Sequence, residues 1–151
     1  MKTFKEYISE ESEKIFWHGS MSDAVSLRHG MHIGTKEQAL KRFSDVTEYK
    51  DKNVNLHMYK ITEKNARKPE EHIEIEDAGS PTLGQALTVA AKQGRIPENI
   101  ARIARKKSDL EKARVLMNRG IHRVTYGNKF EDEGVSHIIV NPDDFKIEKV
   151  W

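Results

Sequence analysis

The string at residues 16–20, which reads FWHGS, holds the residue types with the clearest potential for chemistry. A short aromatic and β-branched run predicts a buried strand that ends at Gly19. Backbone N–H and C=O groups at a glycine can meet the acceptor and the donor of a ligand's primary amide without steric obstruction. The hydroxyl of Ser20 can add a third hydrogen bond, and the His18 imidazole can bind a ligand hydroxyl. These residues therefore form a candidate binding site.

Each of these side chains also has a purely structural interpretation. Ser20, followed by Asp23, fits a capping box and predicts a short helix over residues 21–28. His18 could be a core histidine whose ring is satisfied by the backbone. For Ser20 and for His18, a ligand-binding role and a structural role both remain open.

A second string, GMHIGT at residues 30–35, combines turn-forming glycines with His32 and Thr35. An aromatic ring at such a place can stack on a flat ligand ring. His29 and His32 have helix-like spacing, but Gly30 between them favours a turn. Without further ligands we do not expect a metal site here.

The candidate carboxylates lie in an acidic stretch between Tyr126 and Ser136. A carboxylate beside a glycosidic bond can stabilise the positive charge that develops when the bond breaks. Glu131 is the leading candidate and Glu133 the second. The alternative interpretation of this stretch is a solvated acidic turn.

Both strings resemble the ADP-ribosyltransferases of the poly(ADP-ribose) polymerase and diphtheria-toxin branch, in which a strand ends in His-Gly-Ser or His-Gly-Thr. A glycine, an aromatic-bearing strand and a helix with small residues follow there, as Gly30, the 31–33 run and Ala39 do here. The C-terminal part resembles the ADP-ribosyltransferase-like domains of phage polyvalent proteins. Its matching positions are Tyr126, Asn128, Glu131, Gly134 (one place early) and Ser136, with His137 in place of an aromatic residue.

The resemblance implies an NAD-binding site and names its residues. Catalysis would fall to His18 and Glu131, and NAD would be bound by His18, Gly19, Ser20, His32, Thr35, Tyr126 and Ser136. Two positions depart from the family pattern. His32 stands where the family has its stacking tyrosine, and Ser136 stands where active polymerases have a glutamate, although a serine supplies no negative charge.

The first eight residues, MKTFKEYI, resemble the opening of many T4-like phage proteins, including leaders that direct proteins into the capsid. Such leaders are cut after a hydrophobic-x-Glu pattern, which Ile8-Ser9-Glu10 would fit. The resemblance implies a leader or N-terminal helix over residues 1–14, an ADP-ribosyltransferase-like domain over 15–151, and possible association with a phage capsid. The expected location is the virion, the host bacterial cytoplasm, or both.

Composition limits the function classes. The 151-residue chain has no cysteine, which excludes disulfides, thiolate metal sites and cysteine nucleophiles. No apolar stretch approaches the roughly 18 residues that a membrane span needs, and the first residues lack the apolar centre of a secretory signal. The segment from Arg95 to Arg123 contains nine Lys/Arg residues and only three Asp/Glu residues. This segment could attract nucleic acid or an acidic protein, or could be a solvated helical face.

The elements that must position these residues follow from periodicity and capping signals. Helices are predicted after the Thr35–Gln38, Thr82–Gln85 and Ser108–Glu111 pairs and after Pro97, with a stop at Gly120. Strands are predicted over 15–17, 31–33, 55–61, 122–126, 136–140 and 145–150, with a half-exposed strand around 73–75. This order predicts an α+β domain, and the resemblance implies a split antiparallel β-sheet core with an inserted helical cluster.

Three functions are compatible with these observations. The first is a mono-ADP-ribosyltransferase that modifies a host protein or nucleic acid, with NAD as its substrate. The second is a catalytically inactive binding module on the same fold, as Ser136 and His32 suggest. The third is an RNA-directed enzyme that uses His18, His122 and His137 for acid–base chemistry.

Overall fold

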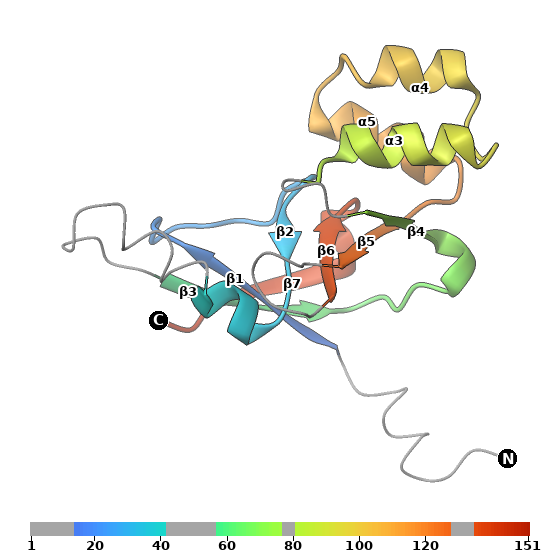
Figure 1. Cartoon of the computed structure of the whole chain (residues 1–151). Helices are drawn as coiled ribbons and strands as arrows, with labels where there is room; N and C mark the ends of the chain where they lie inside the picture. Colours follow the sequence, from blue (N-terminus) through green and yellow to red (C-terminus); the bar gives the residue numbers. More distant parts are fainter. Residues whose placement is uncertain (1–13, 42–56, 77–80, 128–134) are drawn as a thin grey trace, which may run out of the picture.

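The computed structural model describes residues 14–41, 57–76, 81–127 and 135–151. Within these ranges the chain is an α+β fold, as predicted (Figure 1). Its elements, in chain order, are β1 (Ile15–Ser20), β2 (His32–Ile33), a helix over 36–41, β3 (His57–Glu63), η1 (Pro69–Glu71), β4 (His72–Ile75), α3 (Leu83–Lys92), α4 (Glu98–Ala104), α5 (Asp109–Asn118), β5 (Arg123–Gly127), β6 (Val135–Ile139), η2 (Pro142–Asp144) and β7 (Phe145–Lys149).

The strands form two sheets. The three-stranded sheet has the order β1-β3-β7, and the four-stranded sheet has the order β2-β6-β5-β4. An antiparallel bridge between Trp17 of β1 and Gly34 joins the two sheets, through backbone N···O distances of 2.7 and 3.1 Å. The two sheets therefore meet at the place where the two glycine-containing strings lie.

One strand pair departs from the antiparallel expectation. β4 and β5 are parallel, with Ile73 opposite Val124 and Ile75 opposite Tyr126. The helices α3, α4 and α5 connect these two strands, and a parallel pair requires a long crossover of this kind. The inserted helical cluster thus imposes the one parallel pairing among the described strands.

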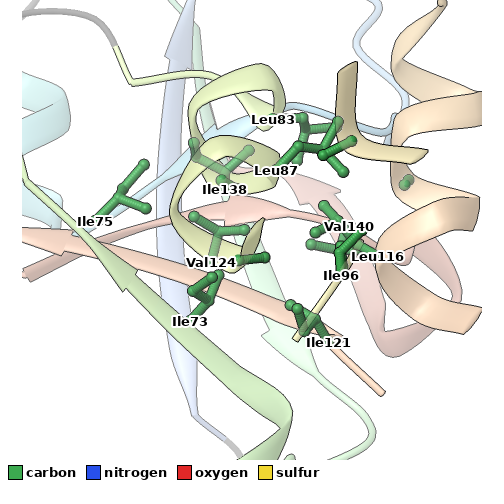
Figure 2. Close-up of a cluster of buried hydrophobic side chains, with 14 of the residues drawn as sticks. Ile73, Ile75, Leu83, Leu87, Ile96, Leu116, Ile121, Val124, Ile138 and Val140 are labelled. Atoms are coloured by element: carbon green, nitrogen blue, oxygen red, sulfur yellow. The ribbon is translucent and has the colours of Figure 1, made fainter. Parts of the chain in front are cut away.

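The main core lies between the helical cluster and the four-stranded sheet. Leu83 and Leu87 of α3 lie over Val124 and Ile138 of β5 and β6, and all four side chains are buried (Figure 2). A smaller cluster joins the two sheets and consists of Met31, Ile33, Ile61, Ile139 and Phe145. Burial on both sides of the four-stranded sheet fixes β6, which carries Ser136.

Local signals in the sequence account for the helix ends. The predicted capping box of α3 forms, because the Thr82 hydroxyl accepts from the Gln85 N–H and the Gln85 side chain accepts from the Thr82 N–H. Ser108 caps α5 in a similar way. Gly120, just after α5, has a φ of +77°, a left-handed conformation that favours glycine.

The predicted helix over residues 21–28 is wrong. These residues form an irregular segment, and Ser20 is the last residue of β1 rather than a helix cap. The Ser20 hydroxyl accepts from the Ser22 N–H, and the Ser22 hydroxyl bonds with both backbone groups of Ala24. Such local side-chain bonds compete with helical hydrogen bonds.

Two further outcomes concern boundaries. β3 runs to Glu63, two residues beyond the predicted end, because it pairs with β1 and β7 along that length. Residues 1–13 of the proposed leader lie outside the described residues, and so do residues 55 and 56 at the start of the strand predicted over 55–61. Within the described ranges no helix is long and apolar enough to cross a membrane.

Candidate functional site

A small, partly open pocket lies where β1 and β2 meet, and its lining residues surround about 320 Å³ of non-atom space, open solvent included. Its walls come from β1, β2, the helix over 36–41, β5 and β6. The lining residues are Trp17, His18, Gly19, His32, Ile33, Gly34, Gln38, Ala39, Tyr126 and Ser136. Five residues predicted for the site from separate parts of the sequence are therefore brought together, namely His18, Gly19, His32, Tyr126 and Ser136.

The backbone of Gly19 faces this pocket. The N–H and C=O of Trp17 bond to Gly34, so they point away from β3. Backbone groups two residues apart on a strand point in the same direction, so those of Gly19 do the same. Its partner in the register, Met58, bonds instead to Val150 and Trp151. Gly19 thus presents one donor and one acceptor toward the side of the pocket.

The two pocket histidines are held in fixed orientations. His18 Nδ1 lies 2.8 Å from the backbone oxygen of His32, and because a carbonyl only accepts, Nδ1 carries the hydrogen. In the neutral ring this tautomer makes Nε2 an acceptor. His32 Nδ1 lies 2.7 Å from the Tyr126 hydroxyl, and the two rings meet edge to face with centroids 5.6 Å apart. Tyr126 therefore orients the ring that the sequence suggested for stacking.

Gln38 lines the pocket and is only 2% exposed. Its side-chain oxygen accepts from the Thr35 N–H at 2.9 Å and from the Ser136 hydroxyl at 2.8 Å. The Thr35 hydroxyl in turn accepts from the Gln38 N–H, which completes the predicted capping box. Thr35 thus orients a pocket residue without lining the pocket itself.

Gly34 leaves the space that the Gln38 side chain occupies. A Cβ atom at this position would lie 2.1 Å from Gln38 Oε1 and 3.0 Å from Ser136 Oγ. Both distances are shorter than ordinary carbon–oxygen contacts. A side chain at this position would therefore force the Gln38 amide to shift, whereas the φ of Gly34 is not in the left-handed region.

Lys36 adds a positive charge beside the pocket. Its Nζ lies 5.1 Å from the centroid of the Trp17 ring, a distance at which a cation is attracted to the ring face. The charge lies next to a wall of the pocket, because Trp17 is a lining residue. It could meet a ligand phosphate there.

Some predicted site residues lie elsewhere. Ser20 does not line the pocket, and its hydroxyl accepts from the Ser22 N–H. Glu131 and Glu133 lie outside the described residues, so their position relative to the pocket stays a prediction. The described lining residues include no aspartate or glutamate.

The histidines of the RNA-directed hypothesis are not gathered. His122 and His137 are absent from the described pocket lining, and His122 Nε2 lies 3.9 Å from Glu71. Burial, followed by the positive charges of Arg123, His72 and Lys14, lowers the pKa of His137 to about 3. His137 is therefore neutral near pH 7, and its Nδ1 lies 3.1 Å from the Thr125 hydroxyl.

A buried charge network supports the strands around the site. Arg123 of β5 pairs with Glu63 of β3, and Arg67 pairs with Asp144 of η2 at 2.6 Å. The side chains of Arg123, Glu63 and Asp144 are each less than 10% exposed. Removing one partner of a buried ion pair destabilises a protein by several kcal/mol, because the other charge is left unpaired. The Arg123–Glu63 pair therefore helps to fix β5 of one sheet against β3 of the other.

Five lining residues were not predicted as parts of the site, namely Trp17, Ile33, Gly34, Gln38 and Ala39. Gln38 was recognised as a helix-capping residue, and that signal was correct but incomplete. The contact with Ser136 spans 98 residues and has no local signature. The described residues also contain no cluster of three or more His, Asp or Glu side chains that could hold a metal ion.

Comparison with known proteins yields no significant match: no family model, no curated protein and no solved structure is detectably similar to this chain.

Proposed function

We propose that this chain is an NAD-dependent mono-ADP-ribosyltransferase of phage origin that modifies a host protein or nucleic acid. The observation that carries the proposal is the Gly19 backbone, which presents a donor and an acceptor toward the pocket. The carboxamide of nicotinamide has one carbonyl oxygen and one NH₂ group, so it complements this pair. The resemblance of the 16–20 string to the His-Gly-Ser strand of ADP-ribosyltransferases supports the same assignment.

The surrounding residues suit the rest of the cofactor. The resemblance assigns His18 to a hydroxyl of the nicotinamide ribose, and the hydrogen bond from Nδ1 to the His32 backbone oxygen orients its ring in the pocket wall. The pyrophosphate of NAD is negatively charged, and Lys36 stands beside Trp17 to meet it. His32, oriented by Tyr126, provides an aromatic surface for the nicotinamide ring.

The reaction breaks the bond between the nicotinamide nitrogen and ribose C1′. The bonding electron pair leaves with nicotinamide, and positive charge develops on the ribose. A nucleophile of the acceptor then forms a bond to C1′ and loses its proton to solvent or to a base. In this proposal Glu131 supplies the carboxylate that stabilises the developing charge.

Labelling with NAD tests the proposal. The protein is incubated with NAD labelled on the adenylate phosphate and with a bacterial lysate, and labelled macromolecules are counted. We expect labelling by the wild type, and a decrease of about 100-fold or more in the initial rate for Glu131→Gln, because one stabilising group is lost. Glu133→Gln tests the second candidate carboxylate and should change the rate little if Glu131 carries this role.

Two results would contradict this proposal. Absence of labelled product with the wild type would remove the transferase activity, whereas equal rates for the wild type and Glu131→Gln would remove the role of Glu131. The affinity of both variants for NAD is also measured by calorimetry. Glu131→Gln should leave this affinity nearly unchanged, so that a lower rate reflects the transfer step.

A binding module without transfer chemistry is the second candidate. The specific observation in its favour is that the described lining residues include no carboxylate, while Ser136 donates to Gln38. This candidate predicts no labelled product together with a stable partner in pull-down experiments. The contacts of Ser136 support a positioning role rather than a charge-stabilising one.

A further inference from the structure

We infer that Gln38 is a ligand-recognising residue of the pocket, whose side-chain NH₂ donates a hydrogen bond to the carbonyl oxygen of the ligand's carboxamide. This inference rests on the proposed binding of nicotinamide. It deepens that proposal by naming a residue that the sequence marks only as a helix cap. Its basis is one buried atom, Gln38 Nε2, which has no hydrogen-bond partner among the described residues.

The orientation of the Gln38 amide follows from its neighbours. The backbone N–H of Thr35 can only donate, so the atom that it meets at 2.9 Å must be the side-chain oxygen. The Ser136 hydroxyl donates to the same oxygen at 2.8 Å. Two donors occupy the two lone pairs of Oε1, and a flipped amide would place NH₂ against the Thr35 N–H. The NH₂ group therefore faces away from both partners.

The place of this NH₂ group makes it unusual. Gln38 is 2% exposed and lines the pocket together with Gly19 and His32. A buried donor without a partner is costly, and native proteins rarely leave one unsatisfied. A ligand with an acceptor oxygen in the pocket would satisfy the donor. This requirement selects a group with an acceptor oxygen, such as a carboxamide, over a purely apolar ring.

The residues around Gln38 are arranged to hold its amide still. The Thr35 hydroxyl accepts from the Gln38 N–H, and the Ser136 hydroxyl of β6 donates to the side-chain oxygen of Gln38. Gly34 leaves room for Oε1, since a Cβ there would lie 2.1 Å away. A side chain fixed in this way loses little conformational entropy when a ligand binds, which increases affinity.

The substitution Gln38→Glu tests the role of the NH₂ group. Glutamate keeps an oxygen for the Thr35 N–H and the Ser136 hydroxyl, but replaces the NH₂ donor with an acceptor. We expect affinity for NAD and for free nicotinamide, measured by isothermal titration calorimetry, to fall at least about 10-fold. Gln85→Glu is the matched control, because Gln85 forms the same capping box with Thr82 away from the pocket. Its affinity should stay within about two-fold of the wild type.

The outcomes separate this inference from the function on which it rests. If the wild type binds NAD and Gln38→Glu binds within two-fold of it, the role of Gln38 is overturned and NAD binding stands. If the wild type binds neither NAD nor nicotinamide, both fail. Selective loss in Gln38→Glu, with Gln85→Glu unchanged, supports the inference.

A second measurement needs no variant and applies if Gln38→Glu does not fold. The side-chain NH₂ signal of Gln38 is followed by ¹H–¹⁵N NMR while nicotinamide is added to the wild-type protein. We expect it to shift and saturate together with the backbone amide of Gly19, while the NH₂ signal of Gln85 stays in place. A Gln38 signal that does not move while that of Gly19 does would overturn the inference.

Discussion

The chain contains two Thr-x-x-Gln capping boxes that are locally almost the same and differ in what surrounds them. In the first, Thr35 N–H meets Gln38 Oε1 at 2.9 Å, and in the second Thr82 N–H meets Gln85 Oε1 at 3.0 Å. The reciprocal bonds are 3.1 and 3.2 Å long. Both boxes begin a helix, so each satisfies the same two backbone donors.

The difference lies in the tertiary contacts. Gln38 is buried and also accepts from Ser136 of β6, whereas Gln85 is only half-buried and Thr82 is exposed. A strand packed against the first box turns a helix cap into part of a pocket wall. In the account proposed above, the same local motif serves capping alone at Thr82 and capping together with ligand recognition at Thr35, depending on which strand lies opposite.

The glycine beside each box gives the largest expected contrast. Gly34→Ala places a Cβ against Gln38 Oε1 and should destabilise the protein by about 1–3 kcal/mol. Gly84→Ala, in the first turn of α3, meets only Thr82 Oγ1 at 3.5 Å and should stabilise by up to about 1 kcal/mol. Urea unfolding measures both, and effects of the same sign would break the comparison.

The pKa of His137 makes the stability of β6 depend on pH, and β6 is the strand whose Ser136 contacts the first box. Burial and nearby positive charges lower this pKa from 6.5 to about 3. Between these values the unfolded chain binds a proton that the folded protein does not, so stability falls as the pH decreases from about 6.5 toward 3. The contribution is at most about 1.4 kcal/mol per pH unit.

The variant His137→Gln should remove this part of the pH dependence. The free energy of unfolding is measured for the wild type and the variant from about pH 7, just above that window, down to about pH 4, which lies inside it. Their difference isolates His137 from the carboxylates that titrate in the same range. Parallel curves would show that the histidine is not held neutral by its surroundings.

The threonines test whether the two boxes contribute equally as caps. Thr35→Ala and Thr82→Ala should each cost about 1 kcal/mol, because each removes the hydroxyl that satisfies a helical N–H. Only Thr35→Ala should also weaken nicotinamide binding, since it loosens Gln38. Thermal unfolding and calorimetry give the two readouts, and equal binding by both variants would remove the special role of the first box.

Ser136 gives an expected change in stability comparable to that of each threonine. Ser136→Ala removes the hydroxyl that donates to Gln38 Oε1 and should cost about 0.5–1.5 kcal/mol. The main readout is nicotinamide affinity, which should fall because the Gln38 amide can then rotate. Unchanged affinity would show that the Thr35 box alone suffices to orient the amide.

Much of the fold could be predicted because its signals are local. Both Thr-x-x-Gln boxes, the Ser108 cap and the Gly120 stop depend on residues within four positions of one another. The alternating or apolar runs also predicted most of the described strands to within about two residues, although β1 runs to Ser20, beyond the predicted 15–17. The helix over 21–28 failed because serine side chains bond locally to the backbone there.

The site was only partly predictable because its decisive contacts are long-range. The Trp17–Gly34 bridge, the Gln38–Ser136 bond and the Arg123–Glu63 pair join residues between 17 and 98 positions apart. No local pattern encodes these contacts. Resemblance supplied His18, Gly19 and Ser136, but packing decides which face of Gly19 is presented and which side chain lies opposite.

The most direct test is a crystal structure of the protein with nicotinamide bound. The account predicts the carboxamide in the pocket, with its NH₂ donating to the Gly19 C=O and its oxygen accepting from the Gly19 N–H and Gln38 Nε2, all within about 3.2 Å. Nicotinamide bound elsewhere, or bound in the pocket with its carboxamide turned away from Gly19 and Gln38, would contradict it.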